Sequence, residues 1–158
     1  MAMPADAINR FLETSRPSEI DIASDPQSVL HAMFDAVVRG DYERVAELLT
    51  NDAELSIMGF GPVDGTWRGR HEVVAGARRN FATLASQQPE IEDLIVQGDR
   101  IAVLMRESGV LRSSGEAYSV RGVQWFTFEG SKIKRLDQII ANNSAREVGV
   151  KPSRVPPA

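Results

Sequence analysis

The first half of the chain carries apolar residues at the spacing of an amphipathic helix. Ser24 or Asp25 is a suitable N-cap, Pro26 fits the first turn, and Gly40 is a typical helix end. Between these signals the apolar residues recur on one side of a helix, which predicts a single buried face. That face consists of Val29, Leu30, Met33, Phe34, Val37 and Val38.

Two further helices and a short strand follow. Asp41 can cap a second helix that runs through Leu49, and residues 53–58 then alternate as a strand. A third helix is expected from His71 to about Ser86.

The second half of the chain alternates apolar and polar residues and predicts four long strands. Short turns rich in glycine and serine separate them, so neighbouring strands are expected to pair antiparallel. An antiparallel sheet with helices on one face makes an α+β domain. The predicted strands are residues 90–97, 100–111, 117–128 and 132–141.

The glycine-rich stretch GFGPVDG, residues 59–65, invites comparison with a nucleotide-binding loop. A dinucleotide fingerprint needs G-x-G-x-x-G directly between a strand and a helix, but here the second gap is one residue longer. Pro62 also removes an amide that a phosphate would need. The stretch therefore predicts a hairpin turn that leads into a short strand at 66–68. Phe60 and Trp67 are then placed to shape the entrance of a ligand pocket.

Composition narrows the classes of function. The 158 residues suit one domain at 25–142, flanked by an arm at 1–24 and a tail at 143–158. The net charge of −4 and the lack of a basic cluster argue against a nucleic-acid partner, and no apolar run is long enough for a membrane. The chain has no cysteine, and its two histidines lie far apart, so a metal site is not expected. We also expect a function that needs no other cofactor. With no recognisable signal peptide, we expect a cytoplasmic protein.

Three phrases spread over residues 25–141 resemble the nuclear-transport-factor-2-like superfamily, which includes ketosteroid isomerases, SnoaL-like polyketide cyclases and limonene-epoxide hydrolases. They are AVVRGDYERVAELLTNDAEL, GTWRGRHEVV and VRGVQWFTFEGSKIKRL. The resemblance implies a cone, in which a strongly curved sheet wraps around three helices and encloses a largely apolar cavity. It also implies that homodimers often form through the sheet. A superfamily this varied does not imply one function.

The resemblance places the functional groups of the ketosteroid isomerases on residues that only partly match. Their tyrosine falls on Met33, their catalytic aspartate on Ile57, and their oxyanion-binding acid on or near Gln124. Met33 and Ile57 cannot exchange a proton, so isomerisation by that route is not expected. Gln124 can still donate a hydrogen bond through its amide.

The epoxide-hydrolase positions are also half kept. By resemblance the arginine falls on Arg106, the first aspartate on Ser108, and the last-strand aspartate on Gln138, with Asp137 beside it. A one-residue bulge decides whether Asp137 or Gln138 faces the cavity. We take Asp137 as the candidate base, with Arg106 and Gln124 stabilising negative charge. The alternative for both charged residues is an ion pair on the sheet, for Asp137 with Arg135 or a neighbouring lysine.

Alternation along the late strands predicts a mostly apolar pocket with a few polar groups, as small-molecule sites require; a packed core is the alternative. This pattern assigns Arg106 and Ser108 to the inner face of their strand. On the opposite face, Arg121, Val123 and Trp125 are expected to form a homodimer contact. The candidate ligand-binding residues are Met33, Ile57, Phe60, Trp67, Phe81, Ser108, Tyr118, Phe126 and Gln138.

The sequence thus predicts a protein that binds a small apolar or aromatic organic molecule. Two functions remain open. The protein is either a cofactor-independent isomerase, cyclase or hydrolase that acts by proton transfer, or a non-catalytic module for ligand binding or dimerisation.

Overall fold

The computed structural model describes residues 25–61 and 63–141. The predicted arm at 1–24 and the predicted tail at 143–158 lie outside the described residues. Within the described part, three helices and a six-stranded sheet form an α+β cone, as predicted. None of these helices is long and apolar enough to cross a membrane.

Helix α2 (Pro26–Arg39) begins and ends at its predicted signals. The carboxylate of Asp25 accepts a hydrogen bond from a backbone N–H of the first turn, and Gly40 ends the helix with a φ of 68°. Helix α3 (Tyr42–Glu47) follows directly and is capped by the side chain of Asp41. A left-handed glycine followed by an aspartate cap allows the chain to turn sharply between the two helices.

Helix α4 (Arg70–Ala82) ends before the predicted Ser86, and the next strand, β3 (Leu84–Gln97), begins correspondingly earlier. Arg112 holds this junction. Its guanidinium donates hydrogen bonds to the backbone oxygens of Ala82 and Leu84 at 3.1 and 2.9 Å. A contact from a residue 28 positions or more along the chain therefore fixes the helix end, and helical periodicity alone could not reveal it.

Six strands form one mixed sheet. Besides β3 they are β1 (Leu49–Met58), β2 (Gly65–Arg68), β4 (Arg100–Leu111), β5 (Ala117–Glu129) and β6 (Lys132–Ala141). Their order is β2-β1-β6-β5-β4-β3, with β1 parallel to β6 and all other neighbours antiparallel. Pro89 lies inside β3, where it is tolerated because an edge strand has one row of amides that need no partner.

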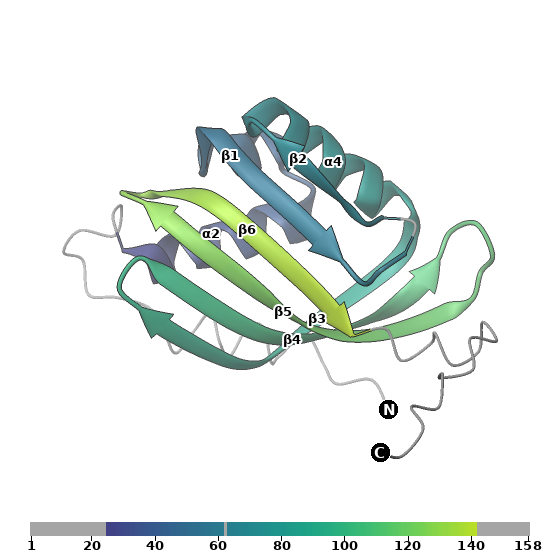
Figure 1. Cartoon of the computed structure of the whole chain (residues 1–158). Coiled ribbons are helices and arrows are strands. Elements are labelled where there is room, and N and C mark those ends of the chain that lie inside the picture. The colour runs from purple at the N-terminus through teal and green to yellow at the C-terminus, as the bar shows by residue number, and fades with distance from the viewer. Residues whose placement is uncertain (1–24, 62, 142–158) are drawn as a thin grey trace, which may run out of the picture.

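The sheet curves around α2 and α4, which lie on the same side of it (Figure 1). The core fills the space between these helices and the concave, inner face of the sheet. Phe34 of α2 packs edge-on against Phe126 of β5, with ring centroids 6.3 Å apart. The largest fully buried side chains are Phe126, Leu30, Ile101, Ile133 and Val103. Burying each stabilises the fold by about 1.5–3 kcal/mol, which holds the helices on this face.

Candidate functional site

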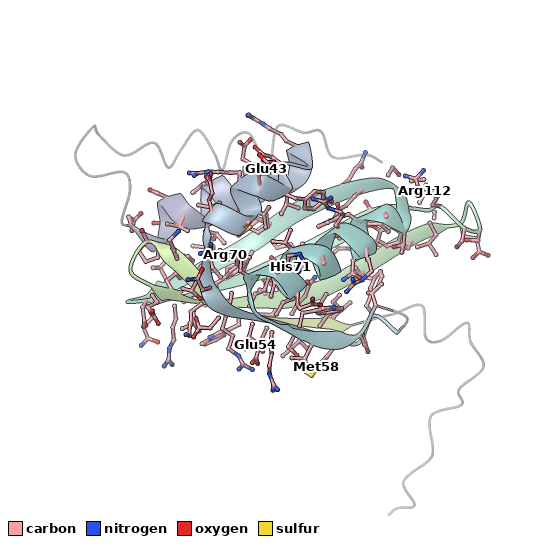
Figure 2. The ribbon with its side chains drawn as sticks, turned by 90° about the horizontal axis from the view of Figure 1, so that it is seen from above. Glu43, Glu54, Met58, Arg70, His71 and Arg112 are labelled. Carbon is pink, nitrogen blue, oxygen red and sulfur yellow. The ribbon has the colours of Figure 1, made fainter. Side chains whose placement is uncertain are left out.

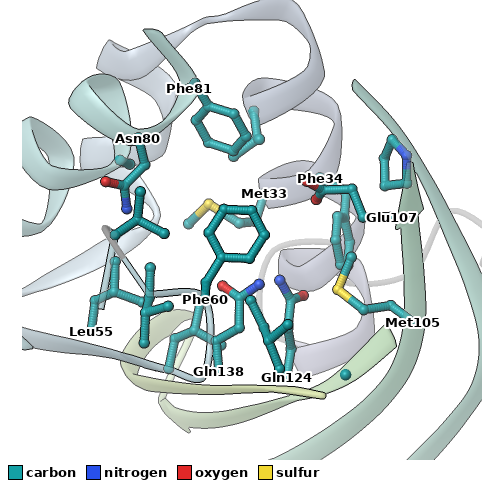
Figure 3. A pocket seen from close by; sticks show the side chains of 18 of the residues that line it. Met33, Phe34, Leu55, Phe60, Asn80, Phe81, Met105, Glu107, Gln124 and Gln138 are labelled. Carbon is teal, nitrogen blue, oxygen red and sulfur yellow. The ribbon is translucent and has the colours of Figure 1, made fainter. Parts of the chain in front are cut away.

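A cavity of about 180 Å³ lies between the helices and the inner face of the sheet. Its wall is mainly aliphatic and aromatic, and four phenylalanine side chains contribute to it (Figure 3). These are Phe34, Phe60, Phe81 and Phe126. An apolar wall with a few polar groups suits a small organic ligand.

Two glutamine amides lie together on the floor of this cavity. Gln124 of β5 and Gln138 of β6 are cross-strand partners, and both amides point into the cavity (Figure 3). The Oε1 atom of Gln124 is buried and has no hydrogen-bond partner among the described residues. An unsatisfied buried oxygen costs about 1–3 kcal/mol, so a ligand that donates a hydrogen bond here would recover that energy.

A carboxylate borders the cavity on the neighbouring strand of the same sheet. Glu107 of β4 lines the cavity and accepts hydrogen bonds from the Tyr118 hydroxyl and from Gln87 Nε2, each at 2.7 Å. Burial, and then the hydrogen bond to the carboxylate, raise the pKa of Tyr118 well above its usual range. Tyr118 therefore stays protonated and serves as a fixed donor that orients Glu107.

The turn between β1 and β2 places an aromatic ring at the cavity. The Asp64 carboxylate accepts hydrogen bonds from the backbone N–H groups of Gly59 and Phe60 at 3.0 and 2.7 Å. The Phe60 ring then meets Tyr118 edge-on, with centroids 6.0 Å apart. Gly59 has a φ of 93°, and a Cβ there would lie 2.1 Å from the backbone oxygen of Ile140, so only glycine fits. The glycine-rich stretch is the predicted hairpin turn, and its aspartate binds the turn's own amides.

Seven predicted site residues lie in the cavity wall. The face assignment of β5 is correct, and the question left open on β6 is answered by Gln138, which lines the cavity where Asp137 does not. Their role in binding stays a prediction. The seven are Met33, Ile57, Phe60, Phe81, Gln124, Phe126 and Gln138.

The assignment of Arg106 and Ser108 to the inner face is wrong, and Asp137, the candidate base, does not line the cavity either. Ile101, Val103 and Met105 are the buried residues of β4, so Arg106 and Ser108 point to the outer face of the sheet. Arg106 forms an ion pair with Glu92 at 3.0 Å. Asp137 accepts two hydrogen bonds from Arg135, at 2.7 and 2.9 Å, which is the alternative considered for it. None of these groups can reach a molecule in the cavity.

Two aromatic residues occupy places other than those expected. Trp67 lies against α4 rather than at the cavity mouth, because its indole fills the space beside Gly76, where a Cβ would come within 2.8 Å of Nε1. Tyr118 acts on the cavity indirectly, through Glu107 and Phe60.

Sequence reasoning missed Glu107, although a signal for it exists. The β4–β5 hairpin pairs Val103 with Gln124 and Glu107 with Val120, and paired residues share a face. Counting outward from the turn at Ser113 and Ser114 would have placed Val103 and Glu107 on the same face as Gln124. The resemblance to an arginine in the epoxide hydrolases drew the assignment to the other face.

The part of the chain that the structure describes has no group of three or more histidine and acidic side chains arranged to hold a metal ion.

The outer face of the sheet carries ion pairs, in contrast to the cavity. Glu54 points away from the helices there, as does Met58 (Figure 2). The Glu54 carboxylate pairs with Arg68 and Arg135 at 3.0 and 2.9 Å.

Comparison with known proteins agrees with this geometry. The nuclear-transport-factor-2-like protein of Burkholderia thailandensis is 20% identical, with a TM-score of 0.68 over 80% of this chain and 98% of that one. TerC, co-crystallised with polyporic acid, is 21% identical, with a TM-score of 0.65 over 77% and 95%. A hypothetical protein from Catenulispora acidiphila with a ketosteroid isomerase-like fold, in complex with trimethylamine, is 15% identical, with a TM-score of 0.64 over 81% and 97%.

At these identities the likeness to solved structures shows the fold alone. Among curated protein sequences, none matches the chain. The sequence model of the SnoaL-like domain, however, matches residues 30–136, which contain most of α2, helices α3 and α4, β1 to β5 and the first half of β6. The chain belongs to the SnoaL-like domain family.

Proposed function

We propose that the cone binds a small, largely apolar organic molecule in the cavity between its helices and its sheet. The observation that carries this proposal is the buried Gln124 oxygen, which faces an apolar cavity and has no donor among the residues that the structure describes. A packed core would pair such an atom, because buried polar groups are nearly always hydrogen-bonded. Support also comes from two relatives of the same fold, which are described with polyporic acid and with trimethylamine.

A matched pair of substitutions on α4 tests this proposal. Ala77 lines the cavity and Ala82 is exposed on the same helix. Ala77→Leu fills space in the cavity, whereas Ala82→Leu adds the same atoms outside it. Phenylnaphthylamine, a neutral fluorophore that brightens in apolar sites, should bind the wild type and Ala82→Leu alike. Its affinity for Ala77→Leu should fall roughly tenfold. Equal affinity for all three proteins, or no binding to the wild type, would contradict the proposal.

Catalysis by proton transfer is a second candidate, favoured by the position of Glu107. A carboxylate in an apolar cavity can remove a proton from a carbon next to a carbonyl group and return it to another carbon. The amide N–H₂ of Gln124 or Gln138 would donate a hydrogen bond to the enolate oxygen that forms between the two steps. This route replaces the predicted one, because Arg106 and Asp137 point away from the cavity.

Turnover of a panel of enones, epoxides and polyketide mimics distinguishes the two candidates. If the protein is an enzyme, Glu107→Gln should reduce the rate strongly, while Arg106→Ala and Asp137→Asn should keep it. A Glu107→Gln variant with wild-type turnover would exclude Glu107 as the base. No turnover of any compound by the wild type favours the binding module.

We also propose that the outer face of the sheet pairs with a second copy of the chain. Two cross-strand rows form an apolar belt there: Ile95, Ala102 and Trp125 in one, and Leu104, Val123, Ile139 and Met58 in the other. Trp125, Ile139 and Ile95 are 42%, 53% and 64% exposed. Charges of both signs border the belt, in the Glu92–Arg121 and Arg135–Asp137 pairs. A face with an apolar centre and mixed charges can match a copy of itself across a two-fold axis.

Light scattering tests the dimer. Trp125→Glu should lower the measured mass from dimer to monomer, since it places a charge at the centre of the belt. Val96→Glu is the control, because Val96 is 44% exposed but pairs with the buried Ile101 on the other face. A monomeric wild type contradicts the dimer, and so does a dimeric Trp125→Glu.

A further inference from the structure

The charges at the cavity are unbalanced. Among the described residues that line it, two are acidic and none is lysine, arginine or histidine. One of the two, Glu54, points its carboxylate to the outer face of the sheet (Figure 2), where it pairs with Arg68 and Arg135, so it gives the cavity no charge. The other, Glu107, has no ion pair with any described residue, and its two donors, Tyr118 and Gln87, are neutral. A cavity with this wall favours positive charge and opposes negative charge.

Glu107 keeps free capacity on the side of the cavity. Tyr118 bonds Oε1 and Gln87 bonds Oε2, so each carboxylate oxygen has one neutral donor. An ionised carboxylate offers about four acceptor sites, which leaves roughly two for a further partner. The two donors fix the orientation of the carboxylate without cancelling its charge, as a recognition group requires.

The aromatic residues strengthen the preference for a cation. The Phe60 ring contacts Tyr118, which donates directly to Glu107, and Phe34 contacts Phe126 on the cavity wall. Aromatic faces attract cations by about 0.5–2 kcal/mol each when the charge is desolvated. An anchored carboxylate together with several phenylalanine rings is an arrangement that binds organic ammonium groups.

From these contacts we propose that the ligand of the cavity is an organic cation, an amine or ammonium group on an apolar body, whose charge pairs with Glu107. This inference rests on the proposed binding function and adds the chemical class of the ligand to it. The apolar body lies against the phenylalanine side chains, and the glutamine amides of β5 and β6 bind any polar substituent that it carries.

A pair of probes of the same shape tests the charge directly. Benzyltrimethylammonium is a cation, and neopentylbenzene is its neutral carbon isostere. Each is used to displace phenylnaphthylamine from the full chain. The cation should bind roughly tenfold more tightly than its isostere. Phenylacetate, an anion with the same ring, should not compete.

Substitution of the carboxylate completes the test. Glu107→Gln should reduce the cation's advantage over its isostere to the part that the aromatic rings supply, while phenylnaphthylamine still binds. Glu116→Gln is the control for net charge, since Glu116 is exposed in the β4–β5 turn, and it should keep the full preference. The wild-type preference is decisive by itself, so a Glu107→Gln protein that fails to fold leaves the test in place.

The outcomes separate this inference from the function on which it rests. If phenylnaphthylamine binds but the cation displaces it no better than the isostere, the cation is wrong and the binding cavity stands. An unchanged preference in Glu107→Gln also overturns the role of the carboxylate. If phenylnaphthylamine does not bind the wild type at all, the proposed function itself fails.

Discussion

The two faces of β5 differ sharply at adjacent positions. Phe126 is 2% exposed on the inner face, where α2 covers it, whereas Trp125 is 42% exposed on the outer face, where no described residue covers it. Both faces of the sheet are therefore apolar at their centre, but only one has a partner within the described chain. An apolar face of a strand is therefore not always the face that packs in the core.

The faces also use their polar groups differently. On the inner face, Glu107 and Gln124 are held among neutral or apolar neighbours, where a charge is poorly screened. On the outer face, Glu92 binds Arg106 and Arg121, whose side chains are both 51% exposed. Ion pairs in such solvent-exposed positions contribute little to stability. A ligand can therefore gain more from the few inner groups than from the many outer ones.

The largest expected change in stability comes from truncating a large side chain on the inner face, compared with one on the outer face. Phe126→Ala should lower the free energy of unfolding by about 3–5 kcal/mol, because it removes a buried ring that packs on Phe34 and Phe128. Trp125→Ala should cost below about 1 kcal/mol within one subunit. Urea unfolding at protein concentrations low enough to dissociate a dimer measures both. Similar losses would contradict the assignment of the core to the inner face alone.

The inner face could be predicted from the sequence only where polar residues mark the opposite face of the strand, and β4 and β5 differ in this respect. On β5 Val120, Phe126 and Phe128 share one parity with Gln124, and Arg121 has the other, so that the inner face was predicted correctly although Trp125 lies opposite. On β4 the residues from Ile101 to Met105 are apolar on both faces, so alternation carries no direction there. When one face of a strand is buried and the other belongs to an apolar belt, the sequence is apolar at every position. Hydrophobic alternation then cannot tell which face is the inner one.

Elements whose signals are local were the most predictable. Caps, glycines and turns set the ends of α2, α3 and the late hairpins, and these were correct to within a few residues. The end of α4 depends on Arg112, which lies in the turn between β4 and β5, far from the helix in sequence. The polar site depends in the same way on contacts between strands, as between Gln87 and Glu107, so its composition could not follow from either segment alone.

The second prediction uses the two tyrosines of the chain to compare an inner hydrogen bond with a surface one. Tyr118→Phe removes the hydroxyl that donates to Glu107 and should lower the free energy of unfolding by about 1.5 kcal/mol, since hydrogen bonds to charged groups contribute most. The ring contact with Phe60 remains. Tyr42→Phe removes a hydroxyl from α3 that has no hydrogen-bond partner among the described residues, and it should be nearly neutral. Equal effects in thermal or urea unfolding would show that the Glu107 cluster contributes nothing special.

The smallest change in stability is expected from Glu92 on the outer face, and its dependence on pH shows whether the carboxylate acts through its charge. A hydrogen bond from Arg121 holds the pKa of Glu92 below its usual value. Desolvation opposes this shift, and the hydrogen bond from Arg106 and the charges of both arginines add to it. Folded protein therefore binds fewer protons at Glu92 than unfolded protein does. The stabilisation is present above the unfolded pKa and is lost as the pH falls through the lower folded pKa.

Glu92→Gln should consequently be slightly less stable than the wild type at pH 7, and this difference should vanish in acid. Added salt should shrink it too, because both arginines are half exposed and their charges are screened. Glu116→Gln is the control for the loss of one charge, since Glu116 is exposed and forms no ion pair with any described residue. Urea unfolding at neutral and acidic pH measures both variants. A difference for Glu92→Gln that persists unchanged in acid would mean that its carboxylate acts by packing rather than by charge, and the outer face would then resemble the inner one more than its exposure implies.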